Sequence, residues 1–386
     1  MLKCSGMHPD GSGPVEVAFG RTIEAVAPAA GFRPRAGGPW LAPGFVDLQV
    51  NGFAGVDYNS PDTAAEEIAC SVRALFPTGV TRFLPTVITA SPDAMAGSLR
   101  NLARARASFP EGEAMAGFHV EGPHISPEDG PRGAHPREWV RRPDFEEFLR
   151  WQDAAEGGIR MVTLAPEWPE APAYIERLVA AGVAVSIGHT AAGAAEIDAA
   201  VRAGATLSTH LGNGAHAVLR RHPNYIWDQL AEDRLMAGFI ADGIHLDGAF
   251  LKSAIRAKTV ARSILVTDAS TPAGAAPGRY RLGAQDVELT DDGRVVLAGT
   301  GRLAGSALRM DAGVGNLVRL AGLPLADAVR MATVNPARAV SLAGRSGGLA
   351  AGDCADLVQF TFDPASARVE VTATWLSGRC VWQAGS

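Results

Sequence analysis

The chain has few cysteines and no long apolar run, and both absences narrow the class of protein. Only four of the 386 residues are cysteine, and none stands in a Cys-x-x-Cys pair, so no disulfide framework is expected. Such cysteine use is typical of a reduced, cytoplasmic compartment. No window approaches about 20 uninterrupted apolar residues, so we expect no membrane span. The N-terminus lacks a basic region followed by an apolar stretch, so no secretory signal is expected.

Several common functional signatures are also missing. We find no Gly-x-Gly-x-x-Gly after a strand, no phosphate-binding Gly-x-x-x-x-Gly-Lys-Ser/Thr loop and no Gly-x-Ser-x-Gly turn, which argues against pyridine-nucleotide redox chemistry and serine hydrolysis. The formal net charge is −6 and there is no basic stripe, which argues against nucleic acid or an anionic membrane as a partner. An anionic small substrate remains possible, because a pocket can be locally basic.

Strand and helix signals alternate along most of the chain. Eight mostly apolar runs read as buried parallel strands, at residues 44–52, 80–87, 115–123, 159–167, 183–190, 205–213, 235–245 and 263–270. Stretches rich in Ala, Leu, Glu and Arg separate most of them. Eight such units predict an α/β fold, a closed (β/α)8 TIM barrel over residues 42–345.

Both ends of the chain have a different pattern. Residues 1–41 and 346–386 contain short alternating strands and turns, which predict one small β-sandwich domain formed from both termini. Within the barrel segment, residues 277–300 predict an inserted β-hairpin with Asp-Asp-Gly at its turn.

Four of the predicted strands end in residues that bind metals or move protons: Glu121, His189, His210 and Asp268. The carboxyl ends of barrel strands converge on one face, so these side chains are expected to meet. One carboxylate and two imidazoles leave an open position on a divalent cation, with Zn²⁺ preferred and Fe²⁺ or Co²⁺ as alternatives. Asp268 then suits proton transfer. Taken singly, each residue also fits an ordinary hydrogen-bonded or capping role; their occurrence at four strand ends favours a hydrolytic metal site.

Further polar residues follow the same strand ends. His135 and His245 lie in loops from which they can donate hydrogen bonds to a substrate oxygen, and Asn213 follows His210 closely. The adjacent Arg220 and Arg221 suit either a solvated surface or a phosphate group.

Together these segments resemble the amidohydrolase superfamily and, within it, the N-acetylglucosamine-6-phosphate deacetylase family. The resemblance covers nearly the whole chain. Its motifs are APGFVDLQVNG (42–52), HVEGP (119–123), RGAH (132–135), LAPE (164–167), GHT (188–190), THLGN (209–213), ADGIH (241–245), VTDAS (266–270), the run 271–318, TVNPAR (333–338) and GDCADLV (352–358).

The resemblance implies hydrolysis of the N-acetyl amide of N-acetylglucosamine 6-phosphate, giving glucosamine 6-phosphate and acetate. It implies that Glu121, His189 and His210 bind the metal and that Asp268 is the general base and then the general acid. It also implies that His135 holds or polarises the acetamido carbonyl.

The same resemblance implies how the phosphorylated amino sugar is bound. Asn213, the backbone N–H of Gly214 and His245 contact the sugar phosphate, and Leu303 lies on the acetyl side. Arg221 reaches the phosphate from a neighbouring subunit, which implies a homodimer.

Two places depart from the wider pattern. Many amidohydrolases have His-x-His at the end of the first strand, where this chain has Gln49 and Asn51, so we predict one divalent metal per subunit. The loop after His210 reads HLGNGAH and is unusual onward to residue 224. Because this loop carries substrate recognition, an amidohydrolase acting on another N-acyl amino sugar or acylated amine stays open as an alternative. Two further alternatives are a non-catalytic barrel used for binding and a metal-dependent isomerase or lyase on the same barrel.

Overall fold

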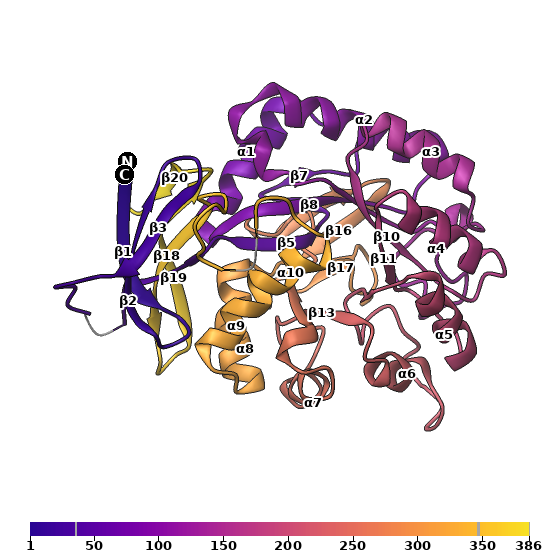
Figure 1. Cartoon of the computed structure of the whole chain (residues 1–386). Coiled ribbons are helices and arrows are strands. Elements are labelled where there is room, and N and C mark those ends of the chain that lie inside the picture. The colour runs from indigo at the N-terminus through magenta and orange to yellow at the C-terminus, as the bar shows by residue number, and fades with distance from the viewer. Residues whose placement is uncertain (35–36, 346–347, 386) are drawn as a thin grey trace.

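A computed structural model describes residues 1–34, 37–345 and 348–385. Eight parallel strands form the central barrel (Figure 1). In hydrogen-bonded order they are β5 (Phe45–Val50), β8 (Val80–Ile88), β9 (Phe118–Glu121), β10 (Ile159–Leu164), β11 (Ala184–Ile187), β12 (Leu207–Ser208), β13 (Met236–Ile240) and β14 (Ser263–Val266). The barrel closes where the Asn51 N–H donates to the Ala269 carbonyl at 2.6 Å. All eight predicted strands are therefore present, although most end earlier than expected.

Helices cover the outside of the strands (Figure 1). One helix follows each of the first seven strands: α1 (Ala65–Leu75), α2 (Pro92–Ser108), α3 (Phe145–Ala154), α4 (Ala171–Ala180), α5 (Ala194–Ala203), α6 (Tyr225–Ala231) and α7 (Gly248–Lys258). Three follow β14: α8 (Met310–Ala321), α9 (Leu325–Ala332) and α10 (Val334–Ala339). Short 3-10 turns are η1 (Phe76–Thr78), η2 (Pro110–Ala114), η3 (Arg137–Trp139) and η4 (Val260–Arg262). No helix in the described ranges has the length and apolar character needed to cross a membrane.

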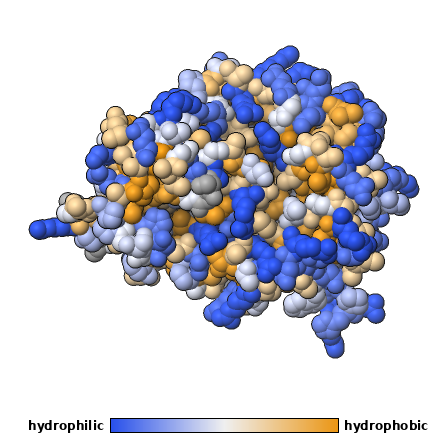
Figure 2. Space-filling model, in the orientation of Figure 1, coloured by the Kyte–Doolittle hydropathy of each residue, from blue (hydrophilic) through white to orange (hydrophobic). Residues whose placement is uncertain are grey.

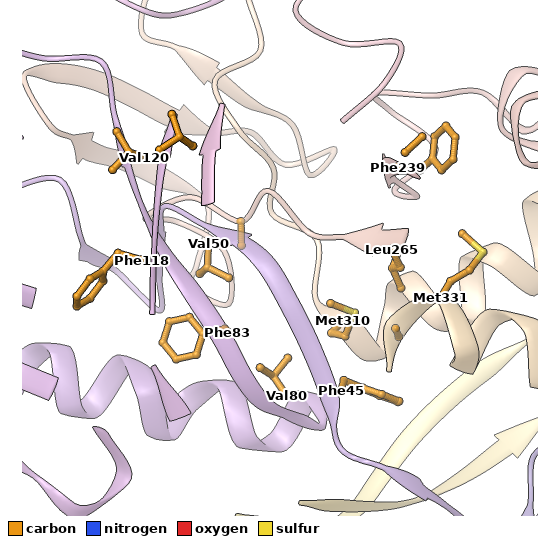
Figure 3. Packing of buried hydrophobic residues seen from close by; sticks show 14 of the residues in the cluster. Phe45, Val50, Val80, Phe83, Phe118, Val120, Phe239, Leu265, Met310 and Met331 are labelled. Carbon is orange, nitrogen blue, oxygen red and sulfur yellow. The ribbon is translucent and has the colours of Figure 1, made fainter. Parts of the chain in front are cut away.

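Strand alternation separates a helix-facing layer from the barrel interior. In β9, Phe118 and Val120 join the large apolar cluster that includes residues of the surrounding helices. Figure 3 shows this layer from close by, with Phe83 and Phe118 between strands and a helix. Because successive side chains point to opposite faces, His119 and Glu121 point into the barrel instead. The same alternation in the other strands sends a second apolar cluster, including Leu48, to the interior.

Strands from both ends of the chain form a separate β domain, as predicted (Figure 1). It is one seven-stranded sheet in the order β20 (Arg379–Gln383), β19 (Arg368–Leu376), β18 (Leu357–Asp363), β4 (Trp40–Pro43), β1 (Leu2–His8), β2 (Gly13–Phe19) and β3 (Ile23–Pro28). Phe19 in β2 and Trp375 in β19 nonetheless meet edge to face, with ring centroids 6.2 Å apart. The sheet therefore folds over on itself and encloses a small core. The domain boundary predicted at residue 41 stays a prediction, and that at 346 lies outside the described residues.

The predicted hairpin insertion is larger than expected. Residues 277–300 form a three-stranded antiparallel sheet of β15 (Gly278–Leu282), β16 (Gln285–Leu289) and β17 (Val295–Leu297). The Asp-Asp-Gly segment lies between β16 and β17, so it makes a turn as predicted. Two further short strands, β6 (Gly52–Phe53) and β7 (Val56–Asp57), form a separate ribbon after β5. On the face seen in Figure 2, hydrophilic residues break the apolar surface into small patches.

A buried ionic cluster joins the terminal sheet to the barrel. The Asp356 carboxylate, just before β18, accepts from Arg82 of β8 at 2.7 Å and from Arg345 at 3.2 Å. It also accepts from the backbone N–H of Ser377 at 2.8 Å. Burial raises the pKa of Asp356, but the two guanidinium groups outweigh this effect and hold its pKa below the ordinary value. The carboxylate is therefore charged and compensates two buried cations.

Replacing Asp356 by Asn should destabilise the fold. The amide has the same shape but leaves two buried guanidinium groups uncompensated, so we expect the free energy of unfolding to fall by about 3–5 kcal/mol. Chemical denaturation followed by fluorescence measures this change. The matched control is Glu370→Gln, which breaks an exposed pair with Arg368 and should change stability by less than about 0.5 kcal/mol. Equal effects of the two substitutions would contradict the structural role of Asp356.

Candidate metal centre and active site

Three of the predicted ligands converge at one end of the barrel. Glu121 ends β9, His189 follows β11 and His210 follows β12. The Glu121 Oε1 atom lies 3.0 Å from His210 Nε2 and 3.3 Å from His189 Nε2. The two Nε2 atoms are 3.1 Å apart. All three ligand atoms lie within 4.8 Å of one another, and the residues are buried.

The hydrogen bonds of the imidazoles fit a cation at this point. His189 Nδ1 lies 2.8 Å from the Pro131 carbonyl, which can only accept, so this nitrogen carries the hydrogen and Nε2 presents its lone pair in the neutral ring. His210 presents Nε2 to the same point, while its buried Nδ1 has no hydrogen-bond partner among the described residues. Two imidazole lone pairs beside a carboxylate oxygen form the donor set that borderline divalent cations prefer.

Backbone strain marks the same positions. His189, His210 and Asp268 have φ values of 51°, 27° and 50°, in the left-handed region that non-glycine residues rarely adopt. Each costs roughly 1–3 kcal/mol and persists only where surrounding structure holds it. Each lies two residues past the end of a barrel strand, where the chain turns at the rim of the barrel.

Gln49 and Asn51 hold carboxylates. Gln49 Nε2 donates to Glu121 Oε1 at 2.9 Å, and Asn51 Nδ2 donates to Asp268 Oδ1 at 2.8 Å. Neither side chain offers the imidazole nitrogen that a second borderline cation would prefer. One metal per subunit stays a prediction.

The pKa values of Glu121 and Asp268 are shifted in opposite directions. Burial raises the pKa of Glu121, but the adjacent imidazoles of His189 and His210 outweigh this effect and hold the pKa well below the ordinary value. Burial and the charge of Glu121 raise the pKa of Asp268 to about 6. Asp268 is therefore the carboxylate suited to accept and return a proton near neutral pH.

His135 lies against the ligand cluster. Its Nε2 is 3.3 Å from His189 Nε2, and its Nδ1 is 2.8 Å from the Thr89 hydroxyl. Burial lowers the pKa of His135 to about 3, so the ring is neutral at physiological pH. His245 is held differently, because the Asp242 carboxylate fixes its Nδ1 at 2.6 Å and leaves Nε2 free.

A cavity of about 520 Å³ opens over these groups. With the exception of Arg221, this cavity is lined by all the residues that the family resemblance assigns to metal binding, catalysis or substrate binding, including Leu303. Arg221 is exposed on the loop before α6, and its contact across a subunit interface stays a prediction. The cavity also contains residues without a sequence-based role, notably Gln285 and Arg302 from the inserted sheet region and His216. Their positions depend on loop packing, for which the sequence contains no periodic signal.

A closed barrel whose strand ends present Glu, two His and a separate Asp defines a metal-dependent hydrolase of the amidohydrolase type. The model of the Amidohydrolase family matches residues 40–381. The N-acetylglucosamine-6-phosphate deacetylase of Bos taurus is 38% identical over 359 residues, covering 90% of this chain and 84% of the relative. That of Bacillus subtilis is 35% identical over 326 residues, covering 84% and 81%.

Solved structures agree with the sequence relatives. The deacetylase of Mycobacterium smegmatis, as a mutant in complex with N-acetyl-D-glucosamine-6-phosphate, superposes with a TM-score of 0.85 at 35% identity. The superposition covers 96% of this chain and 95% of that one. The chain belongs to the amidohydrolase family and, within it, to the family of the N-acetylglucosamine-6-phosphate deacetylases.

We expect one divalent metal per chain, held by the buried Glu-His-His set. Metal analysis of the purified protein should give a ratio near one, and His210→Ala should lower it strongly because a nitrogen ligand is lost. The matched control is His216→Ala, which changes a cavity imidazole that pairs with Glu128 at 3.2 Å instead of joining the cluster. A ratio near two in the unaltered protein, or metal loss in the control alone, would contradict this assignment.

Proposed function

We propose that this chain hydrolyses the N-acetyl amide of N-acetylglucosamine 6-phosphate to glucosamine 6-phosphate and acetate. One observation carries the proposal. A single cavity of about 520 Å³ contains both the buried set of Glu121, His189 and His210 and the separate carboxylate of Asp268, whose pKa is raised. A cavity of this size suits a sugar phosphate. Membership of the deacetylase family supports the choice of substrate.

The proposed metal ligands are Glu121, His189 and His210. A divalent cation bound there supplies Lewis-acid polarisation of a carbonyl and lowers the pKa of water. Zn²⁺ is the proposed ion, since one carboxylate and two imidazoles suit it, with Fe²⁺ or Co²⁺ as alternatives.

Asp268 is the proposed proton carrier. Its carboxylate takes a proton from the water that attacks the acetyl carbonyl, and a tetrahedral intermediate forms. Asp268 then gives that proton to the amine nitrogen as the C–N bond breaks. The Asn51 amide occupies Oδ1 and leaves Oδ2 for this transfer. His135, neutral because of its burial, donates from Nε2 to the carbonyl oxygen when its Nδ1 accepts the Thr89 hydroxyl hydrogen.

The sugar phosphate is proposed to lie on the side of the cavity formed by the loops after β12 and β13. Asn213 and the Gly214 N–H donate to it, His245 contacts it through Nε2, and Leu303 contacts the acetyl group. Arg221 is proposed to act across a homodimer. Large exposed apolar side chains near it support an interface, because Val218 is 89% exposed and Trp227 is 55% exposed. A cytoplasmic location is proposed from the four free cysteines.

A steady-state comparison of N-acetylglucosamine 6-phosphate with N-acetylglucosamine tests the substrate assignment. We expect kcat/KM to favour the phosphorylated sugar on the order of 100-fold or more, because several charge-assisted hydrogen bonds depend on the phosphate. Acetate release distinguishes hydrolysis from isomerase or lyase chemistry. A ratio near one would favour another N-acyl amine as substrate, the alternative that the unusual loop 211–224 supports.

Asp268→Asn should remove proton transfer while it preserves the shape of the site. We expect kcat to fall about 10²- to 10⁴-fold, the usual contribution of general acid–base catalysis. Metal content should stay near one per chain, since Asp268 is outside the ligand set. A variant with nearly normal kcat would show that another group moves the proton.

A further inference from the structure

The catalytic cavity has few cationic side chains with which to bind the substrate phosphate. Glu121 and Asp268 place two carboxyl groups in it, and the other titratable lining groups are imidazoles and the guanidinium of Arg302. Arg221 is not among the lining residues of its own chain. Within the described ranges, Arg302 is the lining residue with a permanently cationic side chain. A phosphate dianion in this cavity therefore has one guanidinium available from the same chain.

The structure fixes Arg302 at the rim of the cavity. Its backbone is held in the turn after β17, where its carbonyl accepts from the Leu297 N–H at 2.9 Å and its N–H donates to Thr300 Oγ1 at 3.2 Å. Its Nη1 donates to the Gly133 carbonyl at 3.1 Å. In the described part of the chain it forms no ion pair with a carboxylate. Most of the five guanidinium N–H donors therefore remain free to bind an anion.

The Gly133 contact places Arg302 beside the loop proposed to bind phosphate. A Cβ atom built on Gly133 would lie 3.0 Å from His189 Cε1, and one built on Gly214 would lie 2.7 Å from His189 Nδ1. Gly133 and Gly214 therefore both lie against the imidazole of His189. Arg302, bonded to Gly133, belongs to the same part of the rim as Gly214, whose N–H is proposed to meet the phosphate.

We propose that Arg302 is a specificity-determining residue that binds the substrate phosphate from the same chain. This inference rests on the proposed function and adds a cation that the chain supplies without a second subunit. A guanidinium suits the task, because its planar fork matches two phosphate oxygens and it stays charged at all physiological pH values.

Arg302 also has a purely structural alternative, which is to hold the loop that carries His135. The matched control for this alternative is Gln285. Its Nε2 donates to the Ala134 carbonyl at 2.6 Å, one residue from the Arg302 contact, and it lines the same cavity without charge. Loss of either side chain loosens the loop, but only the loss of Arg302 removes a cation.

The experiment compares Arg302→Met, Arg302→Lys and Gln285→Met, each assayed with N-acetylglucosamine 6-phosphate and N-acetylglucosamine. In Arg302→Met we expect the preference for the phosphorylated sugar, measured as the ratio of kcat/KM values, to fall about 10- to 100-fold, mainly through KM. Arg302→Lys should restore part of this preference by keeping the charge. Gln285→Met should affect both substrates alike. Competitive inhibition by inorganic phosphate should weaken in Arg302→Met and not in Gln285→Met.

An equal loss with both substrates in Arg302→Met, mainly in kcat and matched by Gln285→Met, would overturn the proposal in favour of loop positioning. Unchanged phosphate inhibition in Arg302→Met would overturn it as well. Failure of the proposed function itself looks different, because the unaltered enzyme would then show no preference for the phosphorylated sugar.

Discussion

The contact of one carboxylate oxygen with two imidazoles is the interaction on which the rest of the site depends. Glu121 Oε1 lies within 3.3 Å of both His189 Nε2 and His210 Nε2, in a buried position at the end of the barrel. A buried carboxylate without compensating partners is strongly disfavoured. The imidazoles and Gln49 therefore keep Glu121 ionised in this buried position.

A belt of buried polar side chains lies beneath these ligands. Thr163 Oγ1 lies 2.7 Å from His119 Nε2 and 2.7 Å from Thr209 Oγ1, which in turn is 2.6 Å from Ser186 Oγ. Burial lowers the pKa of His119 to about 4, so this imidazole is neutral and adds no charge below the ligands. The belt occupies the inward positions just before the ligands and separates the charged site from the apolar interior below.

The strained turns at His189 and Asp268 are held by hydrogen bonds that their backbone carbonyls accept. The His189 carbonyl accepts from the Ser126 N–H at 2.9 Å, and the Asp268 carbonyl accepts from the Ser306 N–H at 2.8 Å. Both donors lie in loops distant in sequence from the residues that they hold. The loop after β9 and the segment after β17 thus hold the left-handed conformations of His189 and Asp268, so the site depends on the packing of these loops as well as on the residue types.

The strand-end residues of the site could be predicted from strand periodicity. The residues that reach the cavity through loop packing could not. Glu121 and Asp268 were identifiable because alternation within a buried strand and a polar residue at its end are local signals. The inward orientation of His119 follows from the same alternation, since it lies two residues before Glu121. Gln285 and Arg302 carry no such signal, because the inserted sheet that brings them to the cavity is positioned by tertiary packing. The third strand of that insertion was missed for the same reason.

The neutral side-chain amides of Gln49 and Asn51, at the end of β5, hydrogen-bond to Glu121 and Asp268 without adding charge. A cationic donor bonded to Asp268 would lower its pKa and leave it a weak base. Asn51 instead orients Asp268 by a neutral hydrogen bond, so burial and the nearby charge of Glu121 can raise its pKa to about 6. Gln49 makes the corresponding neutral bond to Glu121, whose low pKa comes from the imidazoles. Amides in place of a histidine pair therefore orient both carboxylates without adding charge, which suits the role in proton transfer proposed for Asp268.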